Sequence, residues 1–431
     1  GHTLPRLAGA GDSMVRGTQQ VLEEQCMKHG VVRRGDQVPL ELVHSGEQVH
    51  GVIALDMTTG ALNALQAKSV IIADGGYEGI WTGSNVGLGL DLAMKAGLAV
   101  RDLEFVAWAP LAVSGTNVVL PIGLLADGAT LHHSNGTPID VDLTADTTAL
   151  ATAIGSNSDA VLDARNMGES SVWWAQTFEL VSQRLGINMK KQTVPIHPRV
   201  ATTIGGIATD EHGRAVTGKW SRWFTGLYAA GDSACSGLHG AGLIAGNRLL
   251  DSMAGGAAAG EHAADHAGKT AHTGRATLEI ALGAAEADLD FDMAAADEGP
   301  VQRAGPLFAK LGEVMQTSMG YSRDAQGLES ALESLDALAD SAGKLHLDDS
   351  GRLFNTNLLE ALRLKAGIRL ARATIQSAIS RTESRGTHQR TDFTEQDDEQ
   401  LHHTLIDIDG NLSTLAIRKG TSGTWVLSPS E

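Results

Sequence analysis

The residues best suited to chemistry lie in one stretch of the chain, between positions 224 and 251. An apolar run ends in Gly231-Asp232, a Gly-rich segment covers 238–246, and a helix-like run opens at Asn247. An aspartate just beyond a strand can accept hydrogen bonds from hydroxyl groups, and glycines let the backbone approach a flat ring. A helix N-terminus stabilises negative charge. A buried strand with an ordinary turn would explain Gly231-Asp232 alone, but the whole arrangement predicts a ligand pocket.

Other groups capable of chemistry carry less weight. Adjacent side chains on a strand point to opposite faces, so His132-His133 indicates a solvated loop rather than a metal site. Three histidines between 262 and 272 recur at helical spacing on an Ala-rich stretch, which favours a surface helix. Cys26 and Cys235 alone are too few for an iron–sulfur or zinc site, which needs about four ligands. We therefore predict no metal site, and a reducing compartment.

The length, composition and net charge of the chain narrow the class of protein to which it can belong. The chain has 431 residues, 42% of them apolar, with a formal net charge of -18. This length predicts several domains, and the acidic balance argues against a nucleic-acid partner and against direct docking on anionic lipid. No apolar run approaches the roughly 20 residues that span a bilayer. The first residues do not resemble a signal peptide and lack an initiator Met, so we expect a piece of a longer chain or a processed form.

The periodicity of apolar residues predicts the elements that position the pocket. Residues 11–29 are expected to form a helix with Val21 and Leu22 facing inward. Strands are expected at 38–43, 49–57 and 64–72, and a helix at 88–96. This order is typical of an α/β domain.

In the rest of the chain the composition and the expected secondary structure change several times. No Lys or Arg occurs from 102 to 164, and we expect an irregular α+β insertion there. Strand–turn–helix order returns at 199–262. Helices are expected from 276 to 380, with leucines repeating on one face. Short strands are expected at 405–408 and 412–417.

Specific strings then resemble a known family. The matching segments, in chain order, are residues 70–76, 203–207, 224–232, 238–251 and 381–388. The last reads Arg381-Thr382-Glu383-Ser384-Arg385-Gly386-Thr387-His388. Together they resemble the flavoprotein of succinate dehydrogenase and fumarate reductase, a family that includes L-aspartate oxidase. Residues 1–6 also resemble a stretch that lies well inside the flavin domain of that family.

The resemblance implies an α/β, Rossmann-like FAD-binding domain interrupted by an α+β capping domain, then a helical domain and a small C-terminal domain. The expected boundaries are 1–101 and 199–268 for the FAD-binding parts, 102–198 for the cap, and 269–380 and 381–431 for the last two domains. FAD is the implied cofactor. The FAD-side positions carried over are Gly75, Gly76, Gly231, Asp232, His239, Gly240, Asn247, Leu249 and Leu250.

The sequence departs from the family where substrate chemistry is done. Binding a dicarboxylate needs cations for its two carboxylates, and a proton donor. Apolar residues or proline stand where the family has such groups, at Ala109, Pro121, Ile122, Ala201 and Leu243. Arg199, Arg248 and His239 are the nearest candidate catalytic residues, although a solvated surface role is the commoner explanation of each arginine.

Further departures concern FAD itself. The family's first Gly-x-Gly-x-x-Gly turn precedes the part matched here, so we expect weak FAD binding by this chain. Asp74 and Asp91 introduce negative charge near the expected cofactor.

Three interpretations follow from the resemblance. The first is an FAD-dependent oxidoreductase acting on a dicarboxylate-like substrate, with electrons passing to an iron–sulfur subunit. It would be cytoplasmic, held at the inner face of the membrane through anchor subunits. The second is a catalytically silent paralogue that binds flavin or assists assembly, and the third is a fragment that does not function alone.

Overall fold

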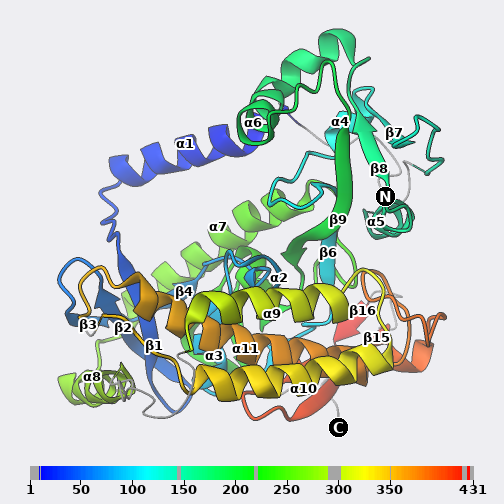
Figure 1. Ribbon diagram of the computed structural model, residues 1–431. Coiled ribbons are helices and arrows are strands. Elements are labelled where there is room, and N and C mark those ends of the chain that lie inside the picture. The colour runs from blue at the N-terminus through cyan, green and yellow to red at the C-terminus, as the bar shows by residue number, and fades with distance from the viewer. Residues whose placement is uncertain are drawn as a thin grey trace. The chain divides into compact units, whose positions relative to one another are not determined.

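A computed structural model describes residues 9, 11–142, 147–217, 222–289, 302–349, 351–419 and 425–427 (Figure 1). The match at residues 1–6 lies outside this part. The chain divides into two compact units. Unit 1 comprises 1–34, 107–201 and 243–249, and unit 2 comprises 35–106, 202–242 and 250–431.

A six-stranded sheet in unit 2 carries the candidate pocket. Its strands are β1 Gln37–Ser45, β2 Gln48–Asp56, β3 Leu62–Gln66, β4 Val70–Ile72, β11 Arg214–Thr217 and β12 Arg222–Ala229. The order is β1-β2-β12-β11, with β3 on β2 and β4 on β12. Strands β4 and β12 are parallel, with Ile72 opposite Ala229. Because parallel strands end at the same edge, the turns that follow them lie together.

The single strand predicted at 64–72 is wrong, because two strands occupy this stretch. Strand β3 pairs antiparallel with β2 as far as Gln66, and Ala67 N donates to His50 O just beyond it. Residues 67–69 then carry the chain to β12, with which β4 pairs. A continuous apolar run does not reveal that its two halves pair with different neighbours.

A second sheet of unit 2 joins the C-terminal segment to residues near position 100. Its strands, in sheet order, are β13 Ala234–Cys235, β10 Gly206–Ala208, β5 Val100–Arg101, β14 His402–Ile406, β15 Leu412–Lys419 and β16 Trp425–Leu427. Strand β14 ends earlier than the predicted 405–408. The backbone turns at Asp407, whose carboxylate accepts from Asp409 N and Asn411 N.

Helices of unit 2 form where the sequence predicts them, except for the short α2, which was not predicted. They are α2 Gly79–Thr82, α3 Leu88–Lys95, α8 Arg275–Leu289, α9 Ala304–Ser318, α10 Ala325–Ala342 and α11 Thr356–Ser380, with most of α7 Asn247–Lys269. Asp324 caps α10 by accepting from Gly327 N, and Asn355 caps α11 by accepting from Leu358 N. Helices α9, α10 and α11 pack side by side, so their leucine faces are buried (Figure 1).

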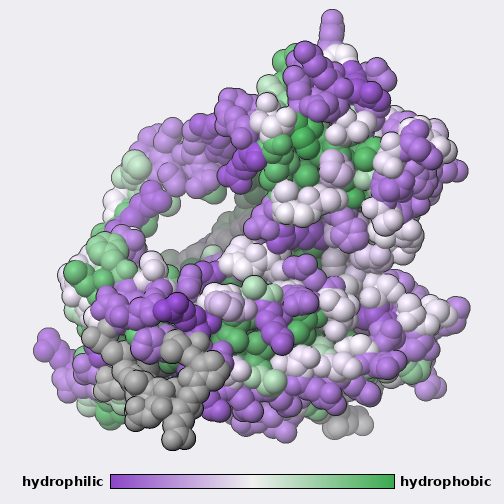
Figure 2. Space-filling model, in the orientation of Figure 1, coloured by the Kyte–Doolittle hydropathy of each residue, from purple (hydrophilic) through white to green (hydrophobic). Residues whose placement is uncertain are grey.

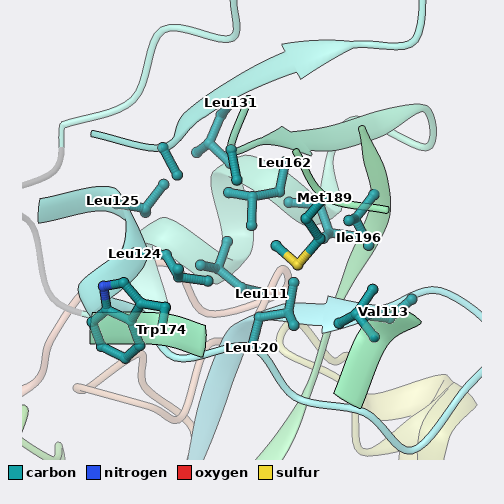
Figure 3. Close-up of a cluster of buried hydrophobic side chains, with 14 of the residues drawn as sticks. Leu111, Val113, Leu120, Leu124, Leu125, Leu131, Leu162, Trp174, Met189 and Ile196 are labelled. Carbon is teal, nitrogen blue, oxygen red and sulfur yellow. The ribbon is translucent and has the colours of Figure 1, made fainter. Parts of the chain in front are cut away.

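Unit 1 is an α+β arrangement around an aliphatic core. Its four-stranded sheet has the order β6 Val106–Val113, β9 Val194–Thr203, β8 Ala160–Asp163 and β7 Thr130–His133. Helices α4 Gly123–Ala126, α5 Thr147–Gly155 and α6 Ala175–Leu185 and the 3-10 helix η1 Gly168–Trp174 accompany the sheet. The side chains of Leu111, Leu124 and Leu162 are fully buried within this core (Figure 3). Trp174 closes one side and donates from Nε1 to Asp127.

The inward orientation predicted for Val21 and Leu22 is wrong. Helix α1 spans Met14–Lys28, and its Val21 and Leu22 are more than half exposed. The face of α1 seen in Figure 2 is mainly hydrophilic. Leu22 and Leu249 line one apolar groove. Periodicity identifies an apolar helix face but not the surface that covers it.

Candidate functional site

The turns that follow β4 and β12 are joined by Ser233. Its Oγ accepts from Gly75 N at 3.1 Å, and its proton can go to Gly75 O at 3.0 Å or Asp74 Oδ1 at 3.1 Å. The 3-10 helix η2, Gly231–Ser233, therefore sits directly against the 74–76 turn. The sequence predicted each turn, and the structure brings them together at one sheet edge.

Asp232 and the neighbouring glycines have defined surroundings. Asp232 is half-buried, and its Oδ2 accepts from Thr202 Oγ1 at 2.8 Å. Gly231 has φ +63°, and a Cβ there would lie 3.1 Å from Ser252 Oγ on α7. A Cβ on Gly76 would lie only 2.4 Å from Thr203 Oγ1, so packing alone requires glycine at that position.

The loop 237–242 presents a histidine beside a carboxylate. His239 Nε2 lies 3.4 Å from Asp251 Oδ2, and both side chains are largely buried. His239 Nδ1 is buried and has no hydrogen-bond partner among the described residues. A Cβ on Gly240 would meet no atom within 4 Å. The loop therefore places one imidazole beside a carboxylate and leaves open space at Gly240.

Large apolar side chains in this loop and on the first turns of α7 are exposed. Leu238 is 65% exposed, Leu250 63% and Met253 47%. Large apolar side chains grouped in this way are typical of a binding surface.

The loop is held by the segment 381–388, a role that sequence reasoning missed. Thr387 N donates to Ala241 O at 2.8 Å. Gly386 has φ +55°, and a Cβ there would lie 2.1 Å from that same oxygen. Only glycine permits this approach. The string that carried the family resemblance thus positions the candidate loop.

Buried charges anchor that segment in turn. Arg381 donates to Glu104 at 2.8 Å and to Glu383 at 2.9 Å, and all three side chains have no exposed surface. Burial raises the pKa of Glu104, and the Arg381 charge offsets part of that rise. Arg385 also donates to Glu383, at 2.7 Å. The alternation of Arg and Glu at 381, 383 and 385 was the only sequence signal of this network.

A second buried pair lies close by. His403 Nδ1 is hydrogen-bonded to Asp102, which has φ +58° and also accepts from Thr404 N. Burial raises the pKa of Asp102, but the charges of His403 and Arg101 outweigh it and leave the pKa lowered. Burial raises the pKa of the nearby Cys235 thiol to about 11, so this cysteine is no nucleophile at neutral pH.

Comparison with known proteins identifies the family of the chain. Residues 3–249 match the family described as FAD binding domain, and residues 308–427 match Fumarate reductase flavoprotein C-term. The chain belongs to the succinate dehydrogenase and fumarate reductase flavoprotein family.

Relatives within this family have low sequence identity to the chain but match most of its length. The fumarate reductase flavoprotein subunit of Mycobacterium tuberculosis is 29% identical over 89% of this chain and 71% of its own length. The mitochondrial succinate dehydrogenase flavoprotein subunit of rice is 28% identical over 93% of this chain and 68% of its own length.

Solved structures are similar over nearly the whole chain. Escherichia coli quinol fumarate reductase FrdA superimposes with a TM-score of 0.83 at 26% identity, covering 96% of this chain and 75% of FrdA. A quinol-fumarate reductase with menaquinol molecules gives 0.86 at 25% identity, covering 98% and 78%.

The flavoprotein family's cofactor suits the residues present in unit 2. Open space at Gly240, the exposed apolar side chains beside it and the half-buried carboxylate of Asp232 fit a flat ring with a hydroxylated chain. The chain contains an FAD-binding domain.

The two carboxylates predicted to lie near the cofactor of this flavoprotein, Asp74 and Asp91, both have hydrogen-bond partners within unit 2. Asp74 Oδ2 accepts from Gly89 N at 2.7 Å and so caps α3. Asp91 is buried and accepts two hydrogen bonds of 2.7 Å from Arg369, while Lys95 lies 3.4 Å away. Neither carboxylate needs a ligand to balance it.

The remaining candidates fall in unit 1. Arg199 Nη1 donates to Thr116 O at 2.6 Å and to the Asn117 side chain, so it braces the turn after β6. Burial lowers the pKa of Arg199. Helix α7 begins at Asn247, as predicted, followed by the exposed Arg248 and the half-buried Leu249.

The described part of the flavoprotein contains no helix both long enough and apolar enough to cross a membrane. Nor do its described residues include a cluster of three or more histidine, cysteine or acidic side chains suited to a metal ion.

Proposed function

We propose that this chain is the flavin-bearing part of an FAD-dependent oxidoreductase that transfers a hydride between a dicarboxylate-like substrate and FAD. The observation that supports this most is the contact between the 74–76 and 231–233 turns at the ends of two parallel strands. Ligands of open α/β sheets bind at such an edge.

The residues of these two turns and of the loop 237–242 each have a role in the proposal. The peptide groups of Gly75 and Gly231 line the cofactor, and Asp232, oriented by Thr202, accepts from a hydroxyl of its chain. His239, which lies beside Asp251, would be close to the ring. Bound FAD would supply the two-electron chemistry that no side chain can provide.

The proposal includes partner subunits. The whole sequence has two cysteines, too few for iron–sulfur clusters. We therefore place the electron acceptor in a separate iron–sulfur subunit, with anchor subunits holding the assembly at the inner face of the cytoplasmic membrane. The domains proposed above, with 102–198 as the cap, belong to the same hypothesis.

A second candidate function is a catalytically silent paralogue that binds flavin or assists assembly. The support for it is the apolar replacement at Ala109, Ala201 and Leu243, together with the engagement of Arg199 in a turn. An apolar side chain cannot replace a charge-assisted carboxylate clamp.

The visible spectrum with FAD distinguishes a flavin binder from a non-binder. We expect titration of the chain with FAD to give a saturable change in the flavin absorption band near 450 nm, even where binding is weak. Asp232→Ala should weaken FAD binding by about tenfold, since it removes a charged hydrogen-bond acceptor. Asp265→Asn, at an exposed salt bridge with Lys269, is the matched control.

Succinate-driven dye reduction then separates the two candidates. Turnover that tracks the FAD content supports the oxidoreductase, whereas bound flavin without turnover supports the silent paralogue. No saturable binding of FAD in the titration would overturn both.

A further inference from the structure

A cavity on unit 2 is lined by residues outside the segments 74–76, 231–233 and 237–242. It has a volume of about 380 Å³ and is bounded by β1, α3, α8 and α11. Leu40, Leu42, Leu92, Leu289 and Leu362 supply apolar walls. Small-molecule sites typically enclose about 300–1,000 Å³ and combine such walls with a few polar groups.

One acidic side chain in the wall is poorly compensated. Glu41 lines the cavity, and its carboxylate makes no hydrogen bond or ion pair within the part of the chain that the structure describes. Burial raises the pKa of Glu41, and the charge of Asp288 across the cavity raises it further. A carboxylate in such surroundings is stabilised by any ligand that donates to it.

The cations nearby have other partners. Lys95 also lines the cavity, but it lies 3.4 Å from the buried Asp91, which Arg369 also contacts, so its charge already has a carboxylate partner. His44 at the same wall is hydrogen-bonded to Gly46 O. Burial lowers the pKa of Lys365 on α11, and the charge of Asp288 offsets part of that change.

We propose that this cavity binds a small organic amine, whose N–H groups donate to Glu41 and whose apolar body packs on the leucine walls. An anion is disfavoured because Glu41 and Asp288 would repel it. This site does not depend on the proposed flavin function.

Titration calorimetry of the 431-residue chain with 2-phenylethylamine tests the site. Its neutral and anionic counterparts, 2-phenylethanol and phenylacetate, should bind at least about tenfold more weakly, as expected from losing one charged hydrogen bond. Equal binding of the alcohol, or no binding of the amine at millimolar concentration, would overturn the proposal.

Two pairs of variants assign the binding to this cavity. Glu41→Gln should weaken amine binding about tenfold, whereas Glu279→Gln, on an exposed part of α8, should not change it. Ala284→Phe should block the cavity from the exposed side of α8, and Ala287→Phe on the same helix should not. Amine binding unaffected by both Glu41→Gln and Ala284→Phe would show that the amine binds elsewhere.

Discussion

The buried side chains around the loop 237–242 in unit 2 differ in kind from those in the core of the unit 1 sheet. Around the loop, Arg381, Glu104 and Glu383 are fully buried and paired with one another. The sheet of unit 1 instead encloses leucines, isoleucines and valines (Figure 3). Its segment 107–164 has no Lys or Arg. The contrast teaches that the buried charges around the loop stabilise its position, whereas segment 107–164 supplies no cation at all, so fold and substrate chemistry must be argued separately.

The largest effect is expected from replacing Arg381, which lies at the centre of the buried charge network. Arg381→Ala leaves Glu104 and Glu383 buried without their partner, and we expect a loss of about 3–5 kcal/mol in the free energy of unfolding. Urea unfolding followed by circular dichroism measures it. Arg372→Ala, at an exposed pair with Asp336, should cost at most about 1 kcal/mol. Similar losses for the two variants would contradict the structural role of the buried network.

Gly386 and Gly240 have nearly equal φ angles, so their alanine variants distinguish the cost of backbone strain from the cost of a steric clash. Gly386→Ala should cost about 2 kcal/mol or more, because its Cβ would collide with Ala241 O in addition to the left-handed strain. Gly240→Ala, in open space, should cost only the strain, about 1–2 kcal/mol. Both are compared by urea midpoint and by FAD affinity. Unchanged FAD affinity in Gly386→Ala would refute the claim that this glycine positions the loop.

Acid should weaken the charged region of unit 2. Burial lowers the pKa of His388 well below 6.5, and burial beside Arg381 lowers that of His402 to about 4. The unfolded chain therefore binds more protons below about pH 6.5, so the stability present above that pH falls as the pH drops. Protonating His388 Nδ1 would also remove the acceptor for Arg323.

Urea midpoints between pH 7 and pH 5 measure this effect. His388→Gln should flatten the pH dependence, whereas His272→Gln, on an exposed side chain, should leave it unchanged. A midpoint that rises on acidification would reverse the sign and reject the assignment.

The smallest expected effect concerns unit 1. Arg199→Met removes the hydrogen bond to Thr116 O and should cost about 1 kcal/mol without changing the flavin spectrum. If Arg199 is instead a substrate cation, the same variant would abolish turnover at unchanged stability.

Local signals in the sequence predicted local structure well. The helix expected at 88–96 is α3, and the helix start expected at Asn247 is the start of α7. Both follow from short-range patterns, glycine breaks followed by apolar periodicity. The two turns that meet at the sheet edge were also predicted, because each ends an apolar strand at Gly75 and Gly231.

Features that depend on distant partners were not predictable. Asp91 looked like an unbalanced charge near a cofactor, because its partner Arg369 lies on α11. The inward face assigned to Val21 failed for the same reason, since a covering surface leaves no trace in the helix itself. The clamp between Gly386 and Ala241 joins two segments that no local pattern connects.

That clamp has a consequence for biosynthesis. Ala241 leaves the ribosome before α7 to α11 are made, and Thr387, which donates to its carbonyl, follows only after them. A contact between such distant segments forms late, because the intervening loop must first be closed. Flavin capture is therefore expected to follow docking of the C-terminal segment, and chains released early would emerge without a finished pocket.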